Sequence, residues 1–371
     1  MKVGVVSEFY YPLWGGVSEH IRAVSNALAA RGHQVTVISS HMRGENGNVG
    51  PRVLRLGRSV PVRYNNSLSR FSVGWRLGEE LRDLLAAEDF DVLHLHSPLQ
   101  PTLTHLALKH ARCPVVATFH SYYPRDLLAE AFQVPLRRRL AAARLRIPVS
   151  QAALRPVERL FPGDYRIIPN GVDYALFAEA RPAALPGLDP ERLRILFVGA
   201  MVKRKGLPLL LRSFARLVEA RGDVDLLVVG DGPDRRRIEA ALPATLAGRV
   251  HFLGAITDRA RLAACYAAAD VFCAPSLGRE SFGMVLLEAM AAGLPCVATA
   301  AGGVREVLAG GEVGVLVPVG DPAAMASAIE SLRTDPERRA RLALAGRARV
   351  AGRTPERLAE DVLEVYREVA S

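Results

Sequence analysis

Residues 1–40 read MKVGVVSEFYYPLWGGVSEHIRAVSNALAARGHQVTVISS and contain the pattern that decides the fold. An apolar run at 3–7 precedes a helical pattern at 17–30, and a second apolar run follows at 35–39. Arg31-Gly32-His33, between the helix and the second run, is a helix stop. A strand, a helix and a strand in this order predict a βαβ unit.

The same alternation continues along the rest of the chain. Further apolar runs stand at 92–95, 115–119, 167–168, 195–199, 226–230, 251–253, 271–274, 296–299 and 314–317. Such runs, covered on both faces by crossover helices, predict parallel sheets in an α/β fold. A chain of 371 residues exceeds what one hydrophobic core usually serves, so two domains are expected.

The stretch 180–192 interrupts this rhythm with three prolines and a glycine, Pro182, Pro186, Gly187 and Pro190, and predicts the boundary between domains. We therefore predict a Rossmann-like N-terminal domain at 1–180 and a linker at 181–192. A second doubly wound domain is expected at 193–352, with a final helix at 353–371. Ligands of such domains bind at the carboxyl ends of the strands.

The bulk properties narrow the class of protein. No segment has the roughly 20 apolar residues of a membrane span, and the N-terminus enters a strand without a signal-peptide pattern. Four widely spaced cysteines indicate small buried side chains in a reducing compartment, so a cytoplasmic protein is expected. The net charge of +10 favours polyanionic partners, although a solvated arginine-rich surface explains much of it equally well.

Three loops after predicted strands carry groups suited to an anion. Gly15-Gly16 precedes a helix, so backbone N–H groups can face a phosphate there, although a tight turn without a ligand fits as well. The run 203–206 places three cations at a helix start, which suits the binding of a diphosphate. A solvated basic turn without a ligand explains the same run equally well. His120 follows the strand 115–119. A histidine at this place either contacts a ligand or has a structural role.

The segment 274–293, APSLGRESFGMVLLEAMAAG, is the most informative one for function. A polar loop carrying Glu280 leads into a helix that is apolar almost throughout except for Glu288. A carboxylate in so apolar a helix is costly without hydrogen-bonding partners, and the hydroxyls of a ribose are suitable donors.

These motifs, in this order, resemble family 4 retaining glycosyltransferases of the GT-B fold. Besides the glycine pair, His120 and the 280–288 segment, the resemblance rests on 168–173 (IPNGVD), Lys205-Gly206 and 230–233 (GDGP). It covers essentially the whole chain and implies two Rossmann-like domains that face across a cleft. It also implies that the last helix returns to the first domain.

The resemblance assigns roles to individual residues. The catalytic set is His120, Glu280, Arg204 and Lys205. The donor-binding set is Gly15, Gly16, Ile256, Asp258, Arg261, Ser281, Phe282, Gly283, Met284, Val285 and Glu288. Fixed cations and helix termini neutralise the diphosphate, so no metal and no cofactor are expected. Many relatives have Arg where this chain has Ala200, and Arg204 is the candidate substitute.

Within the family, the chain most resembles phosphatidylinositol mannosyltransferases, which implies acceptor-binding roles for Tyr10, Tyr64, Asn65 and Arg70. The segment 51–78 holds six arginines and no acid before Glu79, which suits an anionic membrane surface or a mobile basic segment. Asp258 suits the N–H donors of guanine, so GDP-mannose is the expected donor. A UDP-sugar transferase, a nucleotide-sugar epimerase and a non-catalytic lipid-headgroup binder remain alternatives. No base-reading motif is present, so nucleic acid is not an expected partner.

Overall fold

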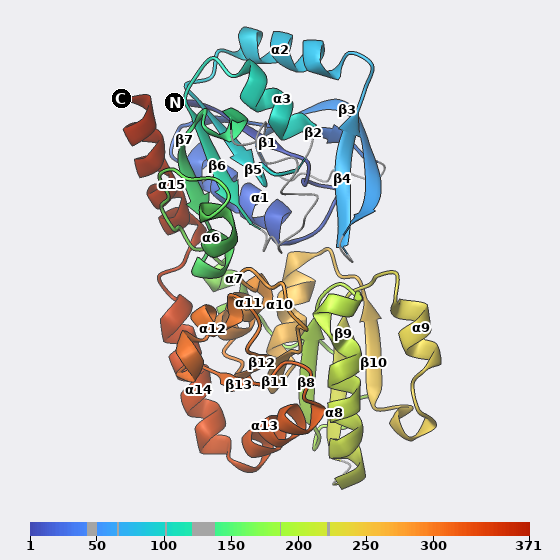
Figure 1. The fold of residues 1–371 in the computed structure, drawn as a ribbon. Helices are drawn as coiled ribbons and strands as arrows, with labels where there is room; N and C mark the ends of the chain where they lie inside the picture. The colour runs from blue at the N-terminus through green and yellow to red at the C-terminus, as the bar shows by residue number, and fades with distance from the viewer. Residues whose placement is uncertain (43–49, 65–66, 101, 121–137, 186, 221–222) are drawn as a thin grey trace. The chain divides into compact units, whose positions relative to one another are not determined.

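The computed structural model describes residues 1–42, 50–64, 67–100, 102–120, 138–185, 187–220 and 223–371. The chain forms two compact units. The first unit comprises Met1–Gly171 and Pro355–Ser371, and the second comprises Val172–Thr354. Both are α/β units built on a mostly or wholly parallel sheet (Figure 1).

The first unit contains a seven-stranded sheet in the order β4-β3-β2-β1-β5-β6-β7. Its strands are β1 (Lys2–Ser7), β2 (Gln34–His41), β3 (Arg52–Tyr64), β4 (Ser67–Val73), β5 (Val92–His96), β6 (Val115–Phe119) and β7 (Ala143–Pro148). All neighbours pair in parallel except β3 and β4, which form an antiparallel pair at one edge. Without β4 the order is that of a Rossmann fold, and the chain order reverses between β1 and β5.

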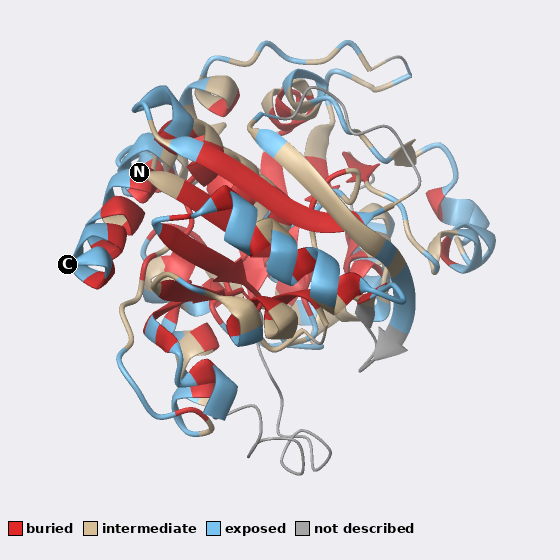
Figure 2. Ribbon diagram, turned by 90° about the horizontal axis from the view of Figure 1, so that it is seen from above, coloured by how far each residue is buried: buried red, intermediate tan, exposed pale blue. Residues whose placement is uncertain are grey.

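Two hydrophobic layers cover this sheet. On one face, α1 (Gly16–Ala30) packs beside α15 (Pro355–Ala370), so the end of the chain completes the core of the first unit. On the other face lie α2 (Leu77–Glu88), α3 (Leu103–His110) and α6 (Gln151–Glu158). The helices turn a buried face inward and an exposed face outward (Figure 2).

The second unit contains a six-stranded parallel sheet in the order β10-β9-β8-β11-β12-β13. Its strands are β8 (Leu193–Val198), β9 (Val224–Val229), β10 (Val250–Gly254), β11 (Val271–Ala274), β12 (Cys296–Thr299) and β13 (Val315–Val317). Its helices are α7 (Tyr174–Ala178), α8 (Leu207–Ala220), α9 (Arg235–Ala240), α10 (Arg259–Ala267), α11 (Met284–Ala291), α12 (Val304–Val307), α13 (Pro322–Thr334) and α14 (Pro336–Val350). Three short 3-10 helices are η1 (Lys203–Lys205), η2 (Ala244–Leu246) and η3 (Ala309–Gly311). The strand order is again that of a Rossmann fold, and it reverses between β8 and β11.

The core of the second unit has the same layered construction. Helices α8 and α13 bury their apolar faces against one side of the sheet. Helix α11 packs on β11 and β12, with α10 and α14 beside it. Two Rossmann-like domains, as the sequence predicts, are therefore confirmed.

The structure differs from the sequence prediction at one expected strand that is absent and at three strands that were not predicted. Residues 167–168 form no strand, and only an isolated bridge joins Arg146 to Tyr165 there. Strand β7 was missed because Arg144 and Arg146 break its apolar run, although Arg146 is buried and donates to the carbonyl of Leu140 at 2.9 Å. The edge strands β3 and β4 were missed because their arginines suggested a basic surface segment.

The domain boundary also lies elsewhere than predicted. The sequence pattern places it after residue 180, whereas the second unit begins at Val172. The physical reason is α7, whose Phe177 is buried with its ring 5.4 Å from that of Tyr266 in α10. Among the described residues, no helix is long and apolar enough to cross a membrane.

Candidate functional site

In the second unit, charged side chains meet where the strand order reverses. The loop after β8 carries Arg204 and Lys205, and the loop after β11 carries Ser276 and Glu280. Lys205 Nζ donates to Glu280 Oε2 at 2.6 Å, the Ser276 hydroxyl donates to the same oxygen at 3.2 Å, and Arg204 Nη1 lies 3.8 Å from it. A carboxylate and two cations thus gather at the edge where this fold binds ligands.

The charge state of this group follows from its surroundings. Burial acts to raise the pKa of Glu280, but the charges of Lys205 and Arg204 and the hydrogen bonds more than offset it, so the pKa is lowered. Glu280 is therefore an anion at neutral pH. It can accept hydrogen bonds from hydroxyl groups, and the cations beside it can hold phosphate oxygens.

Glycines allow the two loops to come this close. Gly206 has φ +73°, and a Cβ there would stand 1.9 Å from the carbonyl oxygen of Pro275. A Cβ at Gly302, which has φ +56°, would likewise stand 2.0 Å from the carbonyl oxygen of Glu280. Arg279 has a positive φ of 55° without being a glycine, a strained conformation of the kind found at functional sites.

The helix that follows this loop is open at its N-terminus. Gly283, at φ +98°, is the N-cap of α11, and no side chain caps the helix. The predicted donor-binding residues Ser281, Phe282 and Gly283 are buried at this terminus, and Met284 and Val285 form its first turn. Backbone N–H groups and the helix dipole favour an anion at such a place.

Glu288 has the hydrogen-bonding partner that its apolar helix requires. Its side chain is buried, and the hydroxyl of Tyr266 donates to Oε2 at 2.8 Å. Burial and the neighbouring carboxylate raise the pKa of Tyr266 well above 10. The sequence predicted a partner for Glu288 but not this one, because Tyr266 lies on a different helix 22 positions away.

The predicted base-binding segment surrounds the start of α10. Asp258 is its N-cap, and one carboxylate oxygen accepts from the N–H groups of Ala260 at 2.8 Å and Arg261 at 3.1 Å. Asp258 and Arg261 are exposed and Ile256 is half-buried. One oxygen of Asp258 thus already has a local structural role.

In the first unit, the loop after β1 leads into the exposed glycines of α1. Gly15 is the N-cap, and its helix has no side-chain cap. Tyr11 donates to Glu19 in the first turn of α1. The structure differs from the sequence prediction at Tyr10, a predicted acceptor contact: its side chain is fully buried, which raises its pKa to about 12. Tyr10 therefore packs in the hydrophobic core next to this loop.

A buried carboxylate fixes the same loop to two other elements. Glu8 accepts from the hydroxyl of Ser72 on β4, and from the Thr102 hydroxyl at 2.9 Å and the Leu103 N–H at 2.6 Å at the start of α3. Burial raises the pKa of Glu8. The loop after β1 is thereby tied to the edge hairpin.

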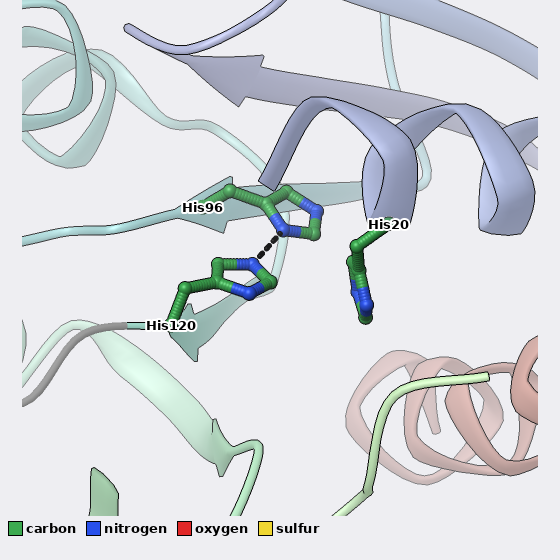
Figure 3. A group of neighbouring side chains, drawn as sticks. All are labelled: His20, His96 and His120. Carbon is green, nitrogen blue, oxygen red and sulfur yellow. Dashed lines mark hydrogen bonds between the residues drawn. The ribbon is translucent and has the colours of Figure 1, made fainter. Parts of the chain in front are cut away.

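His120 belongs to a cluster of imidazoles at the carboxyl ends of β5 and β6. His96 ends β5, His120 follows β6, and His20 approaches from α1 (Figure 3). His96 Nδ1 and His120 Nε2 share a hydrogen bond of 2.8 Å. His20 Nδ1 bonds Asn170 Oδ1 at 2.8 Å, and the His20 ring meets the His120 ring edge to face at 4.7 Å.

Burial keeps the whole cluster neutral. It lowers the pKa of His20 to about 4 and that of His94, which precedes His96 on β5, to about 3. Burial and the neighbouring imidazoles hold the pKa values of His96 and His120 well below 6.5. One ring nitrogen from each of His20, His96 and His120 lies within 4.8 Å of the other two, a spacing that could hold a metal ion. The direct hydrogen bond between His96 and His120 explains the short distance between two of these nitrogens without a metal ion.

A cavity of about 300 Å³ lies in the first unit beside the loop after β1. Pro12 and Leu13 line it on one side, and Arg58, Ser59 and Arg70 on the side of the hairpin. Arg70 Nη1 donates to Ser59 Oγ at 3.2 Å, whereas Nε is buried without a partner among the described residues. Of the other predicted acceptor residues, Asn65 and the side chain of Tyr64 lie outside the described part.

Sequence reasoning did not find the supporting residues. His20 and His96 contact His120, and Tyr266 contacts Glu288, each from a separate element. Asn170 bonds His20, and Ser276 bonds Glu280 from within the same loop. The sequence held a signal for three of them: His96 directly follows the predicted strand 92–95, Asn170 lies in 168–173 and Ser276 lies in 274–293.

Comparisons with known proteins agree with this architecture. Residues 14–176 match the model of "Glycosyltransferase Family 4", and residues 192–335 match that of "Glycosyl transferases group 1". A phosphatidyl-myo-inositol mannosyltransferase of Mycolicibacterium smegmatis is 39% identical over 344 residues, 92% of this chain and 86% of that protein. A GDP-mannose-dependent alpha-mannosyltransferase of Mycobacterium tuberculosis is 31% identical over 395 residues, 100% of this chain and 97% of that protein.

A solved structure extends the likeness to three dimensions. Sucrose-phosphate synthase from Thermosynechococcus elongatus superposes with a TM-score of 0.79 and 26% identity, covering 99% of this chain and 98% of that one. The two Rossmann-like units and these matches define a glycosyltransferase of the GT-B class. The chain belongs to glycosyltransferase family 4.

Proposed function

We propose that the enzyme transfers mannose from GDP-mannose to the inositol headgroup of a phosphatidylinositol, with retention of configuration and without a metal ion. The observation that carries the proposal is the 39% identity, over 92% of the chain, to a phosphatidyl-myo-inositol mannosyltransferase. The likeness to a GDP-mannose-dependent mannosyltransferase supports the choice of donor.

The cation pair of the second unit suits the diphosphate of the donor. Lys205 is bonded to Glu280 in the structure. A bound diphosphate competes for Lys205 and Arg204, and Glu280 then accepts hydrogen bonds from hydroxyls of the transferred sugar. The N-termini of α1 and α11, with Gly15, Gly16 and residues 281–285, supply further N–H groups for the phosphates.

The reaction follows from where charge develops. The bond between the anomeric carbon and the β-phosphate oxygen breaks, and the acceptor hydroxyl oxygen bonds the same face of that carbon. The hydroxyl proton passes to the departing β-phosphate. Because Arg204 and Lys205 are held in place beforehand, they stabilise the leaving diphosphate, and His120 contacts the sugar near the reacting carbon. This same-face transfer is a single displacement, so it needs no carboxylate nucleophile of the kind that a double displacement uses.

The nucleoside end of the donor involves four further residues. Glu288, whose Oε2 accepts from the hydroxyl of Tyr266, also accepts from the ribose hydroxyls. Asp258 already uses Oδ1 as a helix cap, so its Oδ2 is the oxygen offered to guanine. Ile256 and Arg261 lie beside it at the start of α10 and bound the base.

The acceptor side is supported by the cavity of the first unit. Arg58 and Arg70 line it together with His41, and the Nε of Arg70, which bonds none of the described residues, suits a lipid phosphate. Tyr64 is the last residue of β3, and Asn65 follows it in the sequence. Trp75 and Arg76 are highly exposed beyond β4, as expected of a segment that rests on an anionic surface. We place the enzyme in the cytoplasm, peripherally bound to the inner face of the cell membrane.

The test is nucleotide release from GDP-mannose and from UDP-glucose, with vesicles that contain phosphatidylinositol and with vesicles of phosphatidylcholine alone. Release of GDP that depends on phosphatidylinositol supports the proposal. Release of UDP only, or indifference to the vesicles, removes the proposed donor or acceptor. Consumption of a nucleotide sugar without any acceptor supports an epimerase instead.

A matched pair of variants ties the activity to the site. Lys205→Ala removes the cation bonded to Glu280, whereas Lys203→Ala removes an exposed cation two positions earlier in the same loop. We expect Lys205→Ala to lower turnover by roughly 100-fold, in the range seen when one group that stabilises the transition state is removed. Equal effects of the two substitutions contradict the assignment of Lys205.

A further inference from the structure

The surroundings of His120 contain groups that the proposed reaction does not use. His120 is almost fully buried, and its side chain lies against two other imidazoles. A ring whose direction matters for a substrate must be held by its neighbours, because rotation about its two side-chain bonds otherwise moves its nitrogens by several ångströms. The inference below rests on the proposed role of His120.

His96 contacts His120 directly. The two ring centroids are 5.1 Å apart with an interplanar angle of 19°, so the rings lie edge to edge and nearly coplanar, and the bond between His96 Nδ1 and His120 Nε2 is 2.8 Å long (Figure 3). Both residues stand at the ends of adjacent parallel strands, where His96 pairs with Thr118 in the register of the sheet. The hydrogen bond thus occupies one defined nitrogen of His120 and fixes the plane of its ring.

His20 confines the same ring from a second direction. Its ring meets that of His120 at an interplanar angle of 74° and that of His96 at 62°. Asn170 Oδ1 is only an acceptor, so the neutral His20 ring donates from Nδ1 and keeps a lone pair on Nε2. This Nε2 is buried without a hydrogen-bond partner among the described residues.

Asn170 gives the 168–173 motif a function that the donor and acceptor sites leave unexplained. It is buried and lies next to the end of the first unit, since the second begins at Val172. Its hydrogen bond reaches 150 positions back along the chain to α1.

We propose that His96 and His20 are positioning residues for His120. His96 acts through its hydrogen bond to Nε2 of His120. His20, which Asn170 holds in place, acts through edge-to-face packing against the His120 ring. Neither is a catalytic residue, because each acts on the substrate only through the orientation of His120. His94 lies beside this group, with its ring centroid 4.2 Å from that of His96, but its own hydrogen bonds go elsewhere. Its nitrogens bond Tyr366 at 2.7 Å and Thr118 at 2.6 Å.

Two substitutions at one position isolate the hydrogen bond. His96→Ala and His96→Asn both remove the imidazole and its volume, but the amide of Asn stands near the former Nδ1 and can bond His120 Nε2. We expect His96→Ala to lower kcat by roughly 10- to 100-fold with a smaller change in the donor KM, as when a reacting group is misplaced by about 1 Å. His96→Asn should restore most of that loss.

His94→Asn is the matched control. It removes a buried imidazole that packs on His96 two positions earlier on the same strand, so it reproduces the loss of stability and of packing but leaves the hydrogen bond between His96 and His120 in place. Unfolding curves of all three variants establish that each one folds. His20→Phe and His20→Ala form a second pair, in which Phe keeps a ring edge against His120 and retains more of kcat than Ala does.

A spectroscopic readout separates this inference from the proposed function. The ring ¹⁵N resonances of His120, assigned by their loss in His120→Asn, report the hydrogen bond at Nε2. They should shift in His96→Ala and stay near their original positions in His94→Asn. Unchanged His120 resonances in His96→Ala, or a kcat in His96→Asn no higher than in His96→Ala, overturn the inference. Absence of any sugar transfer by the unmodified enzyme overturns the proposed function, and the resonances still decide the inference.

Discussion

A fall in pH from 7 to 5 is expected to weaken the first unit, because its buried imidazoles cannot take up protons while it stays folded. Burial lowers the pKa of His20 to about 4 and that of His94 to about 3. In the unfolded chain, a histidine titrates near 6.5. Below that pH the unfolded state binds protons that the folded state does not, so the free energy of unfolding falls as the pH falls.

The magnitude follows from the two pKa values. One unit of pKa difference corresponds to about 1.4 kcal/mol. At pH 5 the unfolded histidine, with a pKa near 6.5, is almost fully protonated, whereas the folded one is not, so the difference of about 1.5 units between 6.5 and the pH counts almost fully. His20 and His94 should each lower the free energy of unfolding by about 2 kcal/mol at pH 5. At pH 7 the unfolded histidines are mostly neutral, so nearly none of this free energy is lost there. His96 and His120 act in the same direction, since their pKa values are also lowered. Against a usual total of about 5–15 kcal/mol this is a large loss.

Urea unfolding at pH 7, 6 and 5 measures the effect. Both tryptophans, Trp14 and Trp75, belong to the first unit, so their fluorescence reports that unit separately. In His94→Asn one titrating group is gone, and the loss between pH 7 and pH 5 should shrink by about 2 kcal/mol. His41→Asn, at an exposed position, should leave the loss unchanged. The same pH dependence in His94→Asn as in the unmodified protein refutes the reasoning.

Three further outcomes are expected. Glu280→Ala and His120→Ala should keep the fold, judged by circular dichroism, and lose most turnover in the nucleotide-release assay; full activity in both contradicts their roles. Tyr266→Phe leaves the buried Glu288 short of a hydrogen bond and should destabilise the second unit by about 1.5–3 kcal/mol, measured by hydrogen exchange of its amides. Gly206→Ala adds a Cβ 1.9 Å from a carbonyl oxygen at φ +73°, whereas Gly248→Ala has a similar φ of +75° and open space. Gly206→Ala should therefore raise the donor KM and lower stability more than Gly248→Ala, and equal effects of the two count against the packing argument.

Much of the architecture was predictable from the sequence, because it depends on local patterns. Apolar runs and helical periodicity indicate parallel strands with crossover helices, and both Rossmann-like domains, the GT-B class and the glycosyltransferase activity are confirmed. Loops with glycines, cations and Glu280 were identifiable because their residue types are unusual at the ends of apolar strands. The predictions failed where tertiary contacts override composition, as at Arg146, buried on β7, and at Phe177, which draws α7 into the second unit.

The sequence by itself determined the family, the order of the elements and which loops carry charged or polar groups, since all of these are written in short contiguous stretches. Only the tertiary structure decided which groups meet. Parallel strands bring their carboxyl ends to one edge, so His96 and His120 become bonded across 24 positions and Lys205 and Glu280 across 75. It also decided that Tyr10 is buried and that Asn170 holds His20, because burial and long-range hydrogen bonds depend on how the layers pack rather than on neighbouring residues.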